Sequence, residues 1–462
     1  MKKKYVRWTL WTIASPFILF IILCILIYLP PIQNFLVDKA AVYASEATGM
    51  NISVGRISLS FPLNLVVTDV DAASPHKDTL LSVRRLQVNV QLLPLLKKQV
   101  EVDGISLQGA TVNSNDLIHG MRLNGTLGEL FISSHGVALD PETAIVNKVL
   151  LKDTDLSLCL NDTAAADTAA SDTTYWKIIL QDIDLQNVSF ALDMPLDSLS
   201  LAASLDNAIL RDGLIDLHKS AYSLQTFRIK NGRVRYDSGR PSATASADSL
   251  SAGLDPSHIA LTDIGVKLDS LYYGGRNMKA IISQFVLKER SGVEIVSATG
   301  RMVSNDKVLR VPSLKLETRD SYLELNAAMD WNALDFKGEG LMSARLMADI
   351  GKPDVVRFMG RMDEKFVRQY PSEPLRIRTG IDGDLNKLKL TTLTAELPGA
   401  LGLFARGELT HLTDSLLRGG DITLEAETKD LKFVSTLAEG IEIPYGTRLE
   451  GKFTMAGTKM GT

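Results

Sequence analysis

Short runs of alternating apolar and polar residues fill this 462-residue chain from Asn51 almost to its last residue. Typical runs are Leu86-Gln-Val-Asn-Val90, Leu156-Ser-Leu-Cys-Leu160 and Leu314-Lys-Leu316. Successive side chains of a strand point to opposite faces, so this period of two predicts strands with one apolar and one polar face. The chain is therefore predicted to be mostly β. We expect only a few short helices in this part of the chain, at Leu341–Ile350, Asp363–Tyr370 and Leu431–Glu439.

Gly, Asn and Asp separate many of the runs, as at Val102–Ile105, Ile229–Arg233 and Ile381–Asp384. These residues favour tight turns and bulges, so the strands are predicted to pair in a largely antiparallel way. A sheet with one apolar face must bury that face, and the few expected helices cannot cover it. Either the strands close into sandwiches, or one long sheet curls and leaves an apolar trough open. At a spacing of about 4.8 Å, roughly 30 strands in one sheet would extend on the order of 140 Å.

The N-terminal stretch Trp8–Leu29 contains no Asp, Glu, Lys, Arg or His. As a helix it would extend roughly 33 Å, enough to cross a hydrocarbon core of about 30 Å. Lys2, Lys3, Lys4 and Arg7 precede it, and by the positive-inside rule they predict a cytoplasmic N-terminus with the body across the membrane. The alternative is a cleaved signal peptide, whose apolar region is usually shorter and ends at a small-residue cleavage site.

These patterns divide the chain into five regions. We predict a cytoplasmic stub and transmembrane anchor at residues 1–31, a connector helix at 32–50, a first β region at 51–160, a flexible low-complexity loop at 161–174 and a continued β region at 175–462. Apolar residues near a 3.6 spacing support the connector helix, with Gly49 as its stop. It either packs on the first strands or lies on the membrane surface.

Composition and motifs argue against several classes of function. A net charge of -4 without long basic runs disfavours nucleic-acid binding. The six histidines lack zinc-site spacing, and no P-loop or G-x-G-x-x-G motif appears. Asp153-Thr-Asp155 and Asp182-Ile-Asp184 lie in alternating sequence without the Gly and Glu of a calcium loop, which favours solvated strand faces. We therefore predict no enzyme, no cofactor and no metal site.

Residues 44–113 carry a pattern that resembles the opening of AsmA-like and TamB-like envelope proteins. Ala47-Thr-Gly49 closes a helix and is followed by Ile52–Leu59. Leu86–Leu96 then contains Leu-Pro-Leu-Leu, and Val100–Gly109 supplies strands that end in glycine. The resemblance covers this N-terminal portion, and the remainder shares only the style of short amphipathic strands. The sequence stops inside a strand-like run, which argues against a partner role specific to TamB-like proteins or indicates an interrupted gene or a shortened form of a longer protein.

The resemblance implies an N-terminal transmembrane helix followed by a long, twisted, largely antiparallel sheet that curls into an apolar groove. It implies a single-pass protein of the bacterial inner membrane, with a periplasmic body that carries or shields phospholipid acyl chains between the inner and outer membranes. The alternative is a scaffold for the assembly of outer-membrane β-barrel proteins. Such a scaffold would pair with its clients through an exposed strand such as Leu449–Met455.

Ten residues are candidates for lining such a groove, because each has a partner two positions away in an alternating run. They are Ile105, Leu107, Leu156, Leu158, Ile183, Leu185, Leu314, Leu316, Leu323 and Leu325. In a closed sandwich the same ten residues would instead fill a buried core.

Overall fold

The computed structural model of the chain describes residues 39, 41–42, 45–46, 49–60, 64–74, 79–91, 102–114, 120–138, 142–161, 175–239, 253–335, 339–359, 364–437 and 444–455. The chain divides into two compact units, Met1–Leu196 and Asp197–Thr462. The described residues form 21 strands and a few short helices, which confirms a mostly β and largely antiparallel fold. Fewer strands are described than the roughly 30 expected at an average spacing, in part because some strands are 18 residues long.

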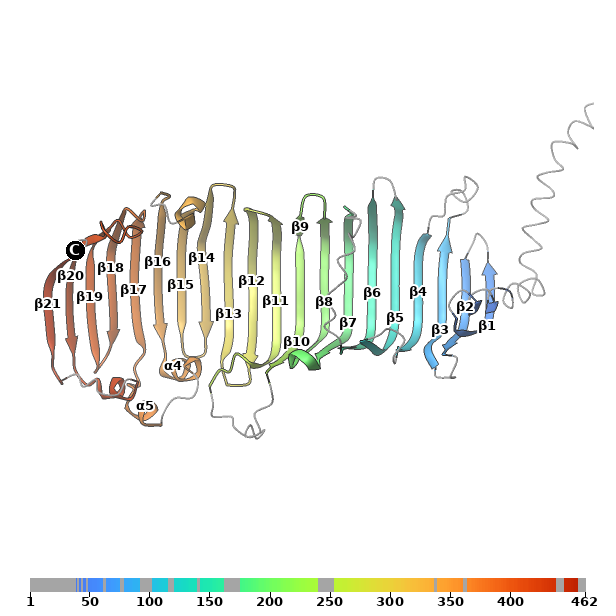
Figure 1. The fold of residues 1–462 in the computed structure, drawn as a ribbon, viewed down its shortest axis with the longest axis horizontal. Helices are drawn as coiled ribbons and strands as arrows, with labels where there is room; N and C mark the ends of the chain where they lie inside the picture. Colours follow the sequence, from blue (N-terminus) through green and yellow to red (C-terminus); the bar gives the residue numbers. More distant parts are fainter. Residues whose placement is uncertain are drawn as a thin grey trace, which may run out of the picture. The chain divides into compact units, whose positions relative to one another are not determined.

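Unit 1 is built from the strands drawn in blue to green in Figure 1. They are β1 (Asn51–Ser60), β2 (Asn64–Ala73), β3 (Thr79–Val90), β4 (Val102–Asn113), β5 (Met121–Ala138), β6 (Thr143–Leu160) and β7 (Lys177–Met194). Strands β1 to β6 pair in sequence order and antiparallel. They lie side by side in a single layer (Figure 1).

Strands β6 and β7 pair in parallel, which the alternation did not predict. Thr143 lies opposite Lys177 at one end of the pair, and Cys159 lies opposite Asp193 at the other. A parallel pair needs a connection that returns along the strand, whereas an antiparallel pair needs only a turn. The low-complexity segment 161–174 belongs to this connection, and all of it except Asn161 lies outside the described residues.

Unit 2 contains the remaining strands. They are β8 (Leu199–Asp216), β9 (Ala221–Leu224), β10 (Thr226–Ser238), β11 (His258–Gly274), β12 (Asn277–Glu289), β13 (Glu294–Ser304), β14 (Val308–Thr318), β15 (Tyr322–Asp330), β16 (Met342–Ile350), β17 (Leu375–Gly383), β18 (Lys387–Leu397), β19 (Leu401–Thr410), β20 (Gly419–Thr428) and β21 (Arg448–Met455). Strands β8 and β11 each pair with both β9 and β10. From β11 to β21 each strand pairs antiparallel with the next.

The helices are short and lie at the ends of strands (Figure 1). They are α4 (Lys352–Phe358), α5 (Glu364–Gln369) and the 3-10 helices η1 (Pro195–Asp197), η2 (Trp331–Asp335) and η3 (Lys432–Thr436). Helix α5 confirms the prediction at Asp363–Tyr370, and η3 lies within the predicted Leu431–Glu439. The helix predicted at Leu341–Ile350 is wrong, because this segment is strand β16 and is paired on both sides. The ladder bonds outweigh the helix propensity of its Leu, Met and Ala residues.

A hydrophobic cluster in unit 2 forms where α5 and η3 meet strand ends. Phe366 and Phe433 pack edge to face with ring centroids 5.8 Å apart, and Tyr370 lies 5.1 Å from Phe433. Leu397 and Ala400, at the turn between β18 and β19, complete the buried set with Leu431. The cluster therefore closes one end of these strands.

Helix α4 is attached to the turn between β14 and β15 through one buried carboxylate. Asp354 is 1% exposed. It accepts hydrogen bonds from the hydroxyls of Thr318 and Ser321, the latter at 2.6 Å, and from Arg357 Nη1 at 3.1 Å. Arg357 also contacts Asp320 at 2.9 Å. These charge-assisted bonds compensate for the burial of the carboxylate.

The three predicted turn or bulge signals fall in different places. Val102–Ile105 lies inside β4 and is a bulge, where the pairing with β3 shifts register between Val102 and Gly104. Ile229–Arg233 is a bulge inside β10, where the pairing with β11 shifts register. Ile381–Asp384 does end a strand, and Gly383 adopts a positive φ of 132° there.

The predicted membrane-spanning stretch, Trp8–Leu29, lies outside the described residues. No helix within the described ranges is long and apolar enough to cross a membrane. In the predicted connector helix, the described residues Lys39, Ala41, Val42, Ser45 and Glu46 are helical. Gly49 follows with a φ of 70°, and its N–H donates to the Ser45 carbonyl at 2.9 Å. This is the left-handed helix end that glycine favours.

Candidate functional site: the apolar faces of the two units

The apolar residues of unit 1 line up across its strands. Residues directly opposite one another in neighbouring strands project from the same face. One row crosses all seven strands and contains two candidates, Leu107 and Leu185. Its members are Ile57, Val67, Leu86, Leu107, Leu130, Leu151 and Leu185.

A second row lies two residues further along each strand and contains the candidates Ile105 and Ile183. Its members are Leu59, Leu65, Val88, Ile105, Ile132, Val149 and Ile183. The two rows together make a continuous apolar band from β1 to β7. No charged or polar side chain interrupts either row.

The remaining two candidates in unit 1 lie on the other half of the strands. Leu158 is opposite Leu123 and Leu192, and Leu156 is opposite Gly125 and Phe190. The structure therefore brings Ile105, Leu107, Ile183 and Leu185 into adjacent rows and places Leu156 and Leu158 apart from them along the strand direction.

The four candidates of unit 2 form one compact patch. Leu314 is opposite Leu325, and Leu316 is opposite Leu323, across the β14–β15 pair. The row through Leu316 continues from β13 to β21. Its members are Ala298, Leu316, Leu323, Ala348, Ile377, Ala395, Leu403, Ala426 and Leu449.

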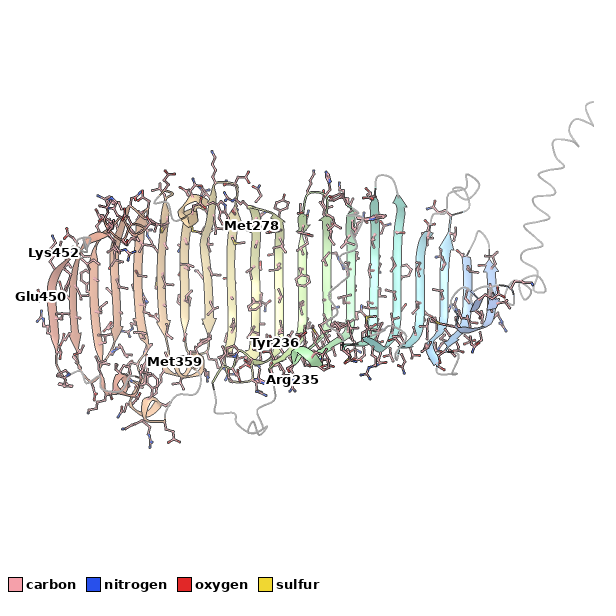
Figure 2. All side chains as sticks on the ribbon, viewed as in Figure 1. Arg235, Tyr236, Met278, Met359, Glu450 and Lys452 are labelled. Carbon is pink, nitrogen blue, oxygen red and sulfur yellow. The ribbon has the colours of Figure 1, made fainter. Side chains whose placement is uncertain are left out.

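The opposite face of unit 2 carries charges. Arg378 Nη2 lies 2.8 Å from Asp349 Oδ1, and Lys387 Nζ lies 3.0 Å from Glu408 Oε1. On β21, the outermost strand of this unit, Figure 2 shows Glu450 and Lys452 projecting from the sheet. Exposed pairs of this kind contribute little stability. Their consequence is that one face is hydrated while the other is apolar.

Among the described residues, no second layer of strands or helices lies over the apolar faces. The main contacts between elements are those of neighbouring strands, and the helices lie at strand ends (Figure 1). All ten candidate residues are half-buried, and none is fully buried. Side chains on the same face shield one another, and their outer ends remain accessible to a ligand or to solvent.

Shifted ionisable groups do not gather on the apolar faces. A hydrogen bond from Lys288 to the Asp263 carboxylate raises the pKa of Lys288. A hydrogen bond to Glu324 raises the pKa of Tyr322, and burial raises that of Tyr370. In the described part of the chain, no group of three or more His, Cys, Asp or Glu residues is arranged to hold a metal ion. The apolar faces therefore offer desolvation rather than acid–base chemistry.

Comparisons with known proteins leave the fold as the main evidence. No protein-family model matches the chain, and no curated protein matches its sequence. The extended, mostly antiparallel strands are compatible with the resemblance to AsmA-like and TamB-like proteins, without identifying that family. The class defined here is a β-protein in which each unit carries an apolar face that no second layer of described residues covers.

Proposed function

We propose that the chain binds lipid acyl chains on its apolar faces and carries or shields them between the inner and outer membranes. One observation carries the proposal: in unit 1, apolar side chains from seven strands form uninterrupted rows that stay half-exposed. A soluble protein rarely exposes a large continuous apolar surface unless something binds there. The work proposed is transfer without a covalent step.

The dimensions and energetics fit an acyl chain. Seven strands at a spacing of about 4.8 Å extend roughly 29 Å, about the thickness of the hydrocarbon core of a bilayer. One lipid leaflet is half as thick, so unit 1 has room for a chain along its rows. Burial contributes about 0.8 kcal/mol per methylene, or on the order of 10 kcal/mol for a long chain before the costs of binding.

Lipid extraction tests this proposal. The full chain is purified after mild release from cells, and bound lipids are identified by mass spectrometry. We expect phospholipid in wild-type protein and much less in Leu107→Asp, which places a charge in the first apolar row. Ser106→Asp is the matched control, since Ser106 is the adjacent residue of β4 and lies opposite Gln87 of β3. Wild-type protein that is always free of lipid would contradict the proposal.

A second candidate function is a scaffold for the assembly of outer-membrane β-barrel proteins. Strand β21 pairs with β20, and within the described residues its other edge has no strand beside it. Such an edge can accept a strand from another protein. Photo-crosslinkers at Leu449 and Phe453 distinguish the two functions. Capture of barrel proteins favours the scaffold, and capture of lipid alone favours transfer.

A further inference from the structure

A line of unusual backbone crosses unit 1 at right angles to its strands. Each strand contributes one residue to this line, and the ladder pairing is interrupted there. These residues, which we name the kink row, are Gly55, Asp69, Arg84, Gly109, Gly128, Asp153 and Asn187. Four of them have positive φ values: 55° at Asp69, 62° at Gly109, 49° at Asp153 and 51° at Asn187. Gly, Asp and Asn are the residues that tolerate this conformation best.

Neighbouring members of the kink row touch one another. Asn187 Nδ2 donates to Asp153 Oδ1 at 2.9 Å. A Cβ atom built on Gly128 would lie 2.8 Å from the Cβ of Asp153, and one built on Gly55 would lie 2.9 Å from the Cβ of Asp69. Because real Cβ atoms do not approach so closely, glycine is required opposite these two left-handed residues.

The apolar pattern shifts phase at the kink row. In β6 the two apolar rows pass through positions 149 and 151 before Asp153, and the leucines after it are at 156, 158 and 160. The half-buried positions of β1 shift in the same way at Gly55, from 52 and 54 before it to 57 and 59 after it. A residue with positive φ breaks the pleat and bends the strand. The shift keeps the apolar side chains of both halves on one face.

Two of the buried residues of unit 1 directly adjoin the kink row: Val83 is 6% exposed and Thr154 is 2% exposed. No layer of described residues covers them. Side chains from the two halves of the bent strands therefore shield this line, as expected for the floor of a concave face.

Unit 2 has a shorter row of the same kind. Asn231 and Asp263 have φ values of 56° and 53°. Asn231 Nδ2 donates to Asp206 Oδ2 at 2.7 Å, and Lys288 Nζ lies 2.8 Å from Asp263 Oδ2. Ala208, two residues beyond Asp206 on β8, is 3% exposed. The same chemistry therefore recurs where β8, β10 and β11 meet.

We propose that the kink row of unit 1 positions the ligand: it bends the sheet into a trough and holds an acyl chain along the line next to it. This inference rests on the proposed function. The chain would contact the apolar residues on either side of the row. On β5 these residues are Leu127 and Leu130, which flank Gly128. The distal Leu123 lies about 13 Å from Leu127 along the strand.

Photo-crosslinking in the full chain tests the position. Benzoylphenylalanine is placed at Leu127, Leu130, Leu123 or the exposed Thr126, and phospholipid with an alkyne-tagged acyl chain is the probe. We expect the yield at Leu127 and Leu130 to be at least fivefold above that at Leu123, and Thr126 to give background. Yields at Leu123 that equal or exceed those beside the row would overturn the inference and leave lipid binding intact. No lipid at any site would instead overturn the proposed function, and the inference with it.

A pair of variants tests the role of the backbone. Asp153→Val places a β-branched residue where φ is positive, whereas Asp153→Gly keeps that conformation accessible. We expect the preference for Leu130 over Leu123 to be lost in the valine variant and kept in the glycine variant. Asp155→Val is the matched control, because Asp155 lies two residues away on the same strand and has no positive φ. If Asp153→Val does not fold, the crosslinking yields of the wild-type protein and of Asp153→Gly still test the inference. An equal yield at Leu130 and Leu123 in these two proteins would contradict it.

Discussion

The charge variant Leu158→Asp separates an open apolar face from a closed core. Leu158 is half-buried between Leu123 and Leu192 in neighbouring strands. On an open face the substitution loses roughly half of the transfer free energy of a leucine, about 1 kcal/mol. The poor strand propensity of Asp adds up to about 1 kcal/mol. The carboxylate itself can reach water, so we expect a total destabilisation of about 1–2 kcal/mol.

A closed core predicts a much larger loss. There the full transfer free energy of leucine, about 1.5–3 kcal/mol, is lost, and an unpaired buried charge adds several more. Urea unfolding followed by circular dichroism measures the difference, with Ser157→Asp as the control that shares the strand-propensity term. A loss of more than about 4 kcal/mol relative to this control would refute the open face. A loss of about 1–2 kcal/mol supports the open face.

Three further predictions concern the fold. Gly128→Ala should destabilise unit 1 by about 1–3 kcal/mol, because the added Cβ would meet Asp153. Gly402→Ala should be nearly neutral, because no atom lies within 4 Å of the Cβ position there. Thermal melts compare the two variants, and equal effects would contradict the requirement for glycine at position 128. Asp354→Ala should cost about 1–3 kcal/mol, because it leaves the Thr318 and Ser321 hydroxyls without their shared acceptor while Arg357 keeps Asp320. Hydrogen exchange at α4 should rise more in this variant than in Asp354→Asn. Deleting residues 162–169 should break the parallel pair of β6 and β7. Leu160 and Lys177 lie at opposite ends of these paired strands, which are up to about 56 Å long. The shortened connection between the two residues would reach only about 32 Å. Loss of amide protection in β7 checks this, and an eight-residue insertion at the same place should be tolerated.

The strands were predictable because their signal is local. In Leu86–Val90 and Leu156–Leu160 each apolar residue is two positions from the next, and both runs lie in strands. The patch formed by Leu314, Leu316, Leu323 and Leu325 also follows from local information, since β14 and β15 are joined by a short turn. Patterns that depend only on residues close together in the sequence are therefore found in the structure as predicted.

The errors arose where distant contacts decide the structure. Met342–Ile350 contains good helix formers, but it forms a strand because β15 and β17 supply hydrogen bonds on both sides. Helix α4 was missed because seven residues carry little periodicity, and contacts of Asp354 with a distant turn hold it in place. The parallel pairing of β6 with β7 was equally inaccessible, since the alternation within a strand is the same in either direction.

The kink row had a signal in the sequence that a search for strict alternation misses. Apolar residues spaced by two are separated once by three, around Gly, Asp or Arg, as between Leu107 and Ala110 or Val67 and Val70. Read one strand at a time, this spacing suggests the end of a run and the start of another. Only the register shows that the interruptions align across seven strands. An isolated bulge bends one strand, whereas an aligned row bends a whole sheet in one direction. In the proposed trough, small and polar residues of the kink row would encode the curvature of the apolar face, and the leucines and valines beside them would supply the surface that a ligand contacts.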